Sequence, residues 1–149
     1  MNKPFLLKPS GKDYLWGGNR IKDDFGKDIN LSPLAESWEC SVHDDGPSIV
    51  ASGEYEGKSL KEVLDENPEY LGTKHKQLPI LIKFIDADKD LSVQVHPNDV
   101  QAKKDNDNGK TEMWYVLDAT KEAKLVYGFN KDCSSEEVRE SIKGRYSSG

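Results

Sequence analysis

Two polar rows in the middle of the sequence carry side chains suited to binding a metal ion. Ser92, Gln94 and His96 alternate with apolar residues, so in an extended strand they fall on one face. Lys110 and Glu112 are also two residues apart and share a face. An imidazole and a carboxylate suit zinc, a Gln94 amide oxygen could add a third ligand, and catalytic zinc sites typically keep one further position open. Two such strands could present both rows to one hollow.

The same spacing has a simpler interpretation. Polar residues two apart on a strand are common by chance, and His96 could be a solvated or hydrogen-bonded histidine on a half-exposed face. Spacing alone therefore leaves the choice between a metal site and an ordinary polar face open.

Two further residues stand out beside these rows. Lys83 lies inside the apolar run 80–85, where a charge is costly unless it is paired or reaches solvent. It could extend to water from an edge strand, or it could point into a cleft and hold an anion such as phosphate. Trp114 shares the face of Glu112, and we interpret it as a packing residue rather than a platform for a sugar ring.

The elements that must position these residues are mainly strands. A turn signal at Asp44–Pro47 makes the segment after it a returning strand, and the last two predicted strands form a hairpin. Alternating faces and turn residues predict strands over Phe5–Lys8, Glu36–His43, Ser48–Ala51, Ile80–Ile85, Leu91–His96, Thr111–Asp118 and Ala123–Phe129.

Short helices interrupt the strands. Ser59 with Glu62, and Ser134 with Glu137, have the spacing of capping boxes that begin helices. Further signals predict a short helix from Asn67–Pro68 to about Gly72, one from Asn98 to Lys104, and an end of the last helix near Lys143, with Gly144 as its stop. Together these elements predict a mainly β fold with helical additions, an antiparallel sheet of jelly-roll type.

Composition narrows the class of protein. The 149 residues suffice for one domain, and 35% hydrophobic with 32% charged residues indicate a soluble chain. The net charge of −6 argues against a general nucleic-acid or membrane-surface binder. We see no apolar run of membrane-spanning length and no signal peptide. Cys40 and Cys133 are far apart, which favours free thiols and a cytoplasmic protein.

Two motifs carry a family resemblance. Gln94-Val95-His96-Pro97, followed by Gly109 to Tyr115 (GKTEMWY), resembles the signature of class I, zinc-dependent mannose-6-phosphate isomerases. The similarity covers nearly all of residues 4–145, and the order of its pieces makes it specific. Supporting matches are Leu15–Gly18, Glu36–Glu39 with Ser41 and His43, Gly46–Ser48, Leu78–Lys83 and Leu125–Phe129.

The resemblance implies an activity and roles for the polar rows. It implies a cupin-type β-barrel core and an aldose–ketose isomerase that interconverts mannose 6-phosphate and fructose 6-phosphate by moving a proton between C2 and C1. By the resemblance, Gln94, His96 and Glu112 bind zinc, with Gln94 the least certain ligand. Lys110 is placed for proton or charge work. The other two residues of the implied substrate site are Lys83 and Ser92.

The sequence departs from the family pattern in one respect. The family carries a further histidine ligand and an arginine in its second half, whereas no histidine follows Glu112 here. We therefore expect residues 1–149 to be the amino-terminal part of such an enzyme, with an incomplete sheet whose open edges could cause self-association. This isolated chain could be inactive. The alternatives are a non-catalytic cupin module that binds a sugar phosphate, and a structural fragment with a vestigial site.

Overall fold

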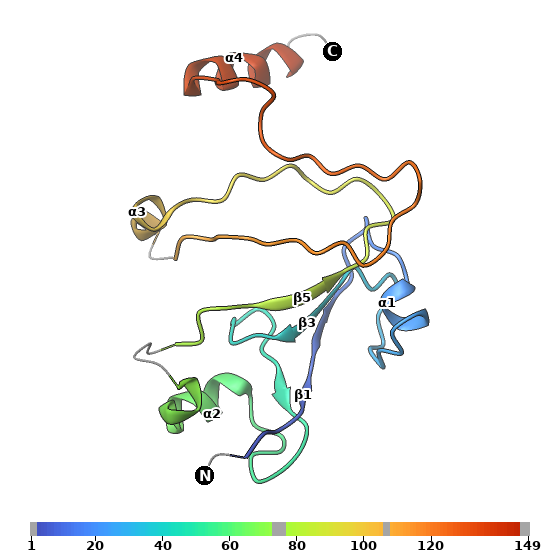
Figure 1. Cartoon of the computed structure of the whole chain (residues 1–149), viewed down its shortest axis with the longest axis vertical. Coiled ribbons are helices and arrows are strands. Elements are labelled where there is room, and N and C mark those ends of the chain that lie inside the picture. The colour runs from blue at the N-terminus through green and yellow to red at the C-terminus, as the bar shows by residue number, and fades with distance from the viewer. Residues whose placement is uncertain (1–2, 73–76, 106–107, 147–149) are drawn as a thin grey trace. The chain divides into compact units, whose positions relative to one another are not determined.

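The computed structural model of the chain describes residues 3–72, 77–105 and 108–146. It divides into two compact units, residues 1–92 and residues 93–149. Strands occur in the first unit, and helices occur in both (Figure 1).

The first unit contains two small antiparallel sheets (Figure 1). In the two-stranded sheet, β1 (Leu7–Lys8) pairs with β4 (Ile49–Val50). In the three-stranded sheet, β3 (Glu36–Cys40) lies between β2 (Ser10–Lys12) and β5 (Ile82–Ile85). The register between β3 and β5 places Trp38 opposite Lys83.

The described part of the first unit also contains three short helices. They are α1 (Arg20–Asp23), α2 (Leu60–Glu66) and the 3₁₀ helix η1 (Pro68–Leu71). The capping box predicted for α2 is confirmed, because the Glu62 amide donates to Ser59 Oγ at 3.1 Å and the Ser59 amide donates to Glu62 Oε2 at 2.8 Å. Gly72, at φ 58°, ends η1 in the left-handed conformation that a glycine adopts without strain.

The core of the described chain lies mostly in this unit. Its buried hydrophobic residues are Ile21, Leu34, Ala35, Val50, Leu60, Val63 and Leu64, whereas Ala102 is the buried hydrophobic residue of the second unit. Two of the buried serines are hydrogen-bonded to each other, since the Ser41 amide donates to Ser48 Oγ at 3.0 Å. Helix α2 supplies three of these seven residues, α1 and β4 one each, and the segment just before β3 the other two, so the apolar packing on which folding depends lies between α2 and these segments.

Several local predictions for this unit are confirmed in shorter form, but one pairing is wrong. The segment after the 44–47 turn returns, since the Ser48 amide donates to the Ser41 carbonyl at 2.9 Å. Yet β4 pairs with β1 and not with β3. Both edges of β3 are already taken by β2 and β5, which leaves it no hydrogen-bonding edge for β4. Strand β2 and helix α1 were not predicted from the sequence.

The second unit contains the helices α3 (Asp99–Ala102), η2 (Lys103–Asp105) and α4 (Ser135–Tyr146). The predicted box at Ser134 is confirmed by its amide, which donates to Glu137 Oε2 at 2.7 Å. The predicted stop at Gly144 is wrong, because α4 continues to Tyr146. A glycine ends a helix only where it leaves the helical conformation.

The three strands predicted between residues 91 and 129 are not found. In the described part of the chain, residues 91–96, 111–118 and 123–129 have no strand assignment. Alternating sequence fixes which side chains share a face, but a strand also needs a ladder of backbone hydrogen bonds to a neighbour. The strand assignments at 91–96, 111–118 and 123–129 were therefore wrong.

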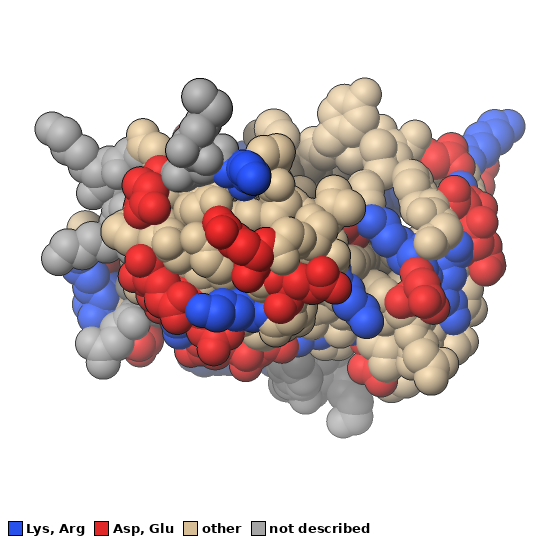
Figure 2. Space-filling view, turned by 90° about the horizontal axis from the view of Figure 1, so that it is seen from below, with Lys and Arg blue, Asp and Glu red and all other residues tan. Residues whose placement is uncertain are grey.

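Two surface properties bear on the class of protein. No helix in the described ranges combines the length and apolar character needed to cross a membrane. On the face seen in Figure 2, acidic and basic side chains are interspersed. That mixture, with the net charge of −6, gives no support to polyanion binding through this face.

Candidate metal centre

The second unit brings His96 and Glu112 into direct contact. Nε2 of His96 lies 3.0 Å from Oε2 of Glu112, and the side chains are 24% and 28% exposed. The predicted proximity of this imidazole and carboxylate is confirmed, although their role as ligands stays a prediction.

Backbone contacts around α3 explain why two residues sixteen positions apart meet. The Lys110 amide donates to the Pro97 carbonyl at 3.1 Å, which joins the segment after α3 to the segment before it. The Gly109 amide donates to Asp99 Oδ1 at 3.1 Å. A Cβ at position 109 would lie 2.5 Å from the Asp99 nitrogen, so only glycine permits this approach. The loop thus sets Glu112 beside His96.

Donors on three sides hold the Glu112 carboxylate ionised. Lys110 Nζ lies 2.7 Å from Oε1, and Trp114 Nε1 donates to Oε2 at 3.3 Å. Burial raises the pKa of Glu112, but the hydrogen bonds from Lys110 and Trp114, the Lys110 charge and the His96 contact outweigh it and lower the pKa to about 2. Glu112 is therefore a carboxylate at neutral pH, which is the form that binds a cation.

The contact fits two positions of a zinc shell. Zinc binds histidine nitrogen and carboxylate oxygen at about 2.0–2.2 Å, so two such atoms at tetrahedral angles stand roughly 3.3 Å apart. The observed 3.0 Å between Nε2 and Oε2 needs only a small opening. Within the described ranges, no three His, Cys, Asp or Glu side chains come together so as to hold a metal ion, so this pair supplies two ligands of that kind and no third. Gln94, an amide, lies exposed two residues before His96.

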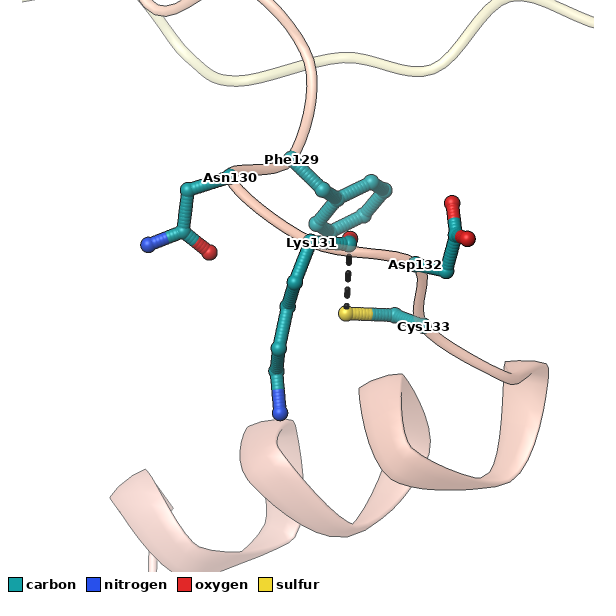
Figure 3. A pocket seen from close by; sticks show the side chains of 5 residues that line it. All are labelled: Phe129, Asn130, Lys131, Asp132 and Cys133. Atoms are coloured by element: carbon teal, nitrogen blue, oxygen red, sulfur yellow. Dashed lines mark hydrogen bonds between the residues drawn. The ribbon is translucent and has the colours of Figure 1, made fainter.

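A small hollow adjoins the pair. It has a volume of about 230 Å³ and is lined by residues 96–99 and 109–111, including His96 and Lys110. Small-molecule pockets usually measure about 300–1,000 Å³, so this hollow accommodates part of a ligand. A second hollow, formed by the consecutive residues 129–133 (Figure 3), contains no predicted site residue. There the Cys133 thiol donates to the Lys131 carbonyl at 3.5 Å.

Lys83 and Ser92 belong to the first unit. Lys83 stands on β5, an edge strand, but its Nζ lies 3.1 Å from Oε1 of Glu36, whose side chain is only 8% exposed. Trp38 Nε1 donates to the other oxygen of that carboxylate at 2.7 Å. The cost of the charge in an apolar strand is thus offset by an ion pair. Ser92 is exposed.

The roles of Glu36 and Trp114 were not predicted from the sequence. The charge of Lys83 inside an apolar run was a signal that a carboxylate should lie close to it. Trp114 is 46% exposed, so its interpretation as a packing residue is wrong. Its position two residues after Glu112 was the available signal, since that spacing places an indole N–H within reach of the carboxylate.

Comparisons with known proteins agree on one family. The family described as phosphomannose isomerase type I, catalytic domain, matches residues 5–140. The chain is similar to "Probable mannose-6-phosphate isomerase GmuF" of Bacillus subtilis, with 40% identity over 100% of this chain and 47% of the relative. It is also 40% identical to the mannose-6-phosphate isomerase of Streptococcus mutans, over 95% of this chain and 45% of that protein.

A solved structure gives the same result for the fold. The crystal structure of the mannose 6-phosphate isomerase from Bacillus subtilis superposes with a TM-score of 0.88 at 36% identity, over 98% of this chain and 48% of that one. The predicted mainly β fold of cupin type is confirmed by this likeness. The chain spans about half the length of the curated relatives it matches.

Proposed function

Because this chain belongs to the type I phosphomannose isomerase family, we propose that it forms part of a metal-dependent sugar-phosphate isomerase. The reaction is the interconversion of mannose 6-phosphate and fructose 6-phosphate. The observation that carries the proposal is the 3.0 Å contact between His96 and Glu112, in a chain whose relatives are named mannose-6-phosphate isomerases.

Residues 1–149 correspond, in this proposal, to the amino-terminal part of a cupin-type isomerase. The chain aligns with 47% of one curated relative and 45% of another, which supports that assignment. The enzyme works in the cytoplasm, which fits the free cysteines Cys40 and Cys133.

The proposed metal is zinc, held by His96 Nε2 and Glu112 Oε2, with the Gln94 amide oxygen as a further ligand. A bound zinc ion supplies Lewis acidity to the sugar oxygens at C1 and C2. His96 must present its Nε2 lone pair and therefore be neutral at that atom. Glu112 needs no deprotonation at neutral pH, since its pKa is about 2.

Lys110 is the proposed catalytic residue. Its ammonium lies 2.7 Å from Oε1 of Glu112, beside the atoms that would hold the metal. A fixed positive charge there stabilises the oxyanion that develops as a proton moves between C2 and C1. Lys83 and Ser92 are the proposed substrate-binding residues, for the phosphate or a sugar oxygen. Lys83 would do so with Glu36 already beside it, so its charge is partly compensated.

Metal analysis and an isomerase assay test the proposal directly. Both are run on this chain and on a version extended at its carboxyl end. Glu112→Gln should reduce bound zinc, because the neutral amide is a poorer ligand. Glu122→Gln is the matched control, since Glu122 is an exposed residue of the same unit. Equal zinc content in the two variants would remove Glu112 from the site. An extended version that binds sugar phosphate without turnover would favour a non-catalytic binding module.

A further inference from the structure

Trp114 is the residue at the candidate metal centre that the proposed function leaves without a task. It follows Glu112 by two positions in an extended segment and is 46% exposed, so its large ring is not committed to a core. Its indole N–H, a group that can only donate, points to Oε2 of Glu112 at 3.3 Å. That oxygen is the same one that contacts His96 at 3.0 Å.

The two oxygens of the Glu112 carboxylate have different partners. Oε1 is taken by the Lys110 ammonium at 2.7 Å. Oε2 accepts from the Trp114 indole N–H and also contacts Nε2 of His96. A cation held jointly with His96 Nε2 would therefore meet Oε2, while Lys110 retains Oε1. This arrangement favours a binding mode in which Glu112 binds the cation through Oε2 alone.

Lys110 alone cannot keep Oε2 turned toward the cation, so a second hydrogen-bond donor to the Glu112 carboxylate is needed. The terminal torsion of a glutamate side chain is broad and roughly two-fold, so the carboxylate can turn about its axis and present either oxygen or both. A lysine is a flexible point charge that can follow such a rotation. An indole is planar and has two torsions, so a donor fixed on Oε2 resists it. When a cation replaces the His96 hydrogen bond, the Trp114 bond to Oε2 can remain.

We propose that Trp114 is a positioning residue, whose indole N–H holds Oε2 of Glu112 toward the cation that Glu112 shares with His96. The proposal rests on the metal-dependent function proposed above. It assigns no contact between Trp114 and the substrate, and it replaces both the packing and the sugar-platform interpretations of this residue. Groups that orient metal ligands in this way typically contribute about 10- to 100-fold to metal affinity.

A calorimetric titration of the purified, metal-free chain with Zn²⁺ measures its Zn²⁺ affinity and tests the positioning role of Trp114 directly. Trp114→Phe keeps an aromatic ring but removes the donor, and should weaken Zn²⁺ binding by about 10- to 100-fold. Its unfolding midpoint in urea should not change, because the ring is half exposed. Tyr115→Phe, at an 81% exposed neighbour, is the matched control and should bind Zn²⁺ as the unsubstituted chain does.

A second measurement, by NMR, is made on the unsubstituted chain, so its result does not depend on whether a variant folds. In the unsubstituted chain, the indole ¹H–¹⁵N resonance of Trp114, assigned by its loss in Trp114→Phe, should shift on addition of Zn²⁺ while the indole resonances of Trp16 and Trp38 stay in place. If Trp114→Phe binds Zn²⁺ with unchanged affinity, or the Trp114 resonance does not move, the positioning role is wrong and the metal site stands. If neither the unsubstituted chain nor the version extended at its carboxyl end binds Zn²⁺, the metal site fails first and the positioning role fails with it.

Discussion

The two units of the chain hold their functional side chains in different ways. In the first unit, Lys83 is paired with a carboxylate that is 8% exposed, between strands in register. In the second, Lys110 is 47% exposed and its partner Glu112 28% exposed, on segments that lack strand pairing in the described ranges. The same kind of ion pair therefore belongs to the packed structure in one unit and to an accessible site in the other.

The distribution of apolar side chains shows the same contrast. Seven of the eight buried hydrophobic residues in the described chain belong to the first unit. Thirteen of the twenty exposed large hydrophobic residues belong to the second, among them Met113, Tyr115 and Tyr127. We infer that substitutions in the first unit act mainly on folding, and that those in the second act mainly on binding.

The largest expected effect comes from breaking the buried ion pair. Lys83→Met leaves the Glu36 carboxylate almost fully buried without its cation, and should lower the free energy of unfolding by about 3–5 kcal/mol. Lys110→Met breaks an exposed pair and should cost no more than about 1 kcal/mol. Urea denaturation followed by circular dichroism measures both.

The double variant Glu36→Gln/Lys83→Met is the control for this prediction. It removes both charges and should recover a large part of the lost stability. Equal losses for Lys83→Met and Lys110→Met would contradict the contrast between the units. A loss of substrate affinity in Lys83→Met, the role proposed for this lysine, is therefore interpretable only beside the double variant.

Core truncation should give the next largest effect. Leu34 is 0% exposed and Leu125 is 57% exposed. Leu34→Ala removes fully buried methyl groups and should cost about 2–5 kcal/mol. Leu125→Ala should change stability by only about 0.5 kcal/mol. Equilibrium urea unfolding measures the free energy of unfolding of both variants. A similar loss of stability in both would reveal a second core around Leu125.

The features predicted correctly from the sequence are those whose signals are local. The capping boxes at Ser59 and Ser134 and the apolar strand ending at Ile85 were predictable, because their signals lie within a few residues of each other. The partners of β3 were not, since strand pairing joins residues about 25–50 positions apart and leaves no local mark. Alternation at 111–118 put Trp114 on the face of Glu112, to which its indole N–H donates, but the strands predicted at 91–96 and 111–118 are not found.

The candidate site was predictable to a similar degree. Face alternation placed Lys110 beside Glu112, whereas the prediction that His96 and Glu112 serve one site came from the family resemblance, because spacing alone left an ordinary polar face open. The buried partner of Lys83 was missed because the sequence states that a charge needs a partner without saying which carboxylate supplies it. The donor role of Trp114 was missed because a large aromatic ring is more often a core residue than a hydrogen-bond donor.

A smaller effect is expected from acid titration of the second unit. The pKa of Glu112, about 2 when folded against 4.5 for an ordinary glutamate, is lowered by folding. Its ionised contacts are therefore present above pH 4.5 and are lost as the pH falls from about 4.5 to about 2. Lys110→Met should raise the pKa of Glu112 toward 4.5, and NMR titration of the carboxyl carbon of the metal-free chain measures it. A pKa unmoved by the substitution would mean that Lys110 does not hold this carboxylate.

The smallest effect compares two capping boxes of the same type. Ser59→Ala removes the cap of α2, whose residues Leu60, Val63 and Leu64 are buried, and should lower global stability by about 1 kcal/mol. Ser134→Ala removes the equivalent cap of α4. Helix α4 has no residue among the buried hydrophobic set in the described ranges, so the urea midpoint should stay unchanged while helical circular dichroism falls slightly. A urea midpoint lowered equally by both variants would show that α4 contributes to the cooperative core.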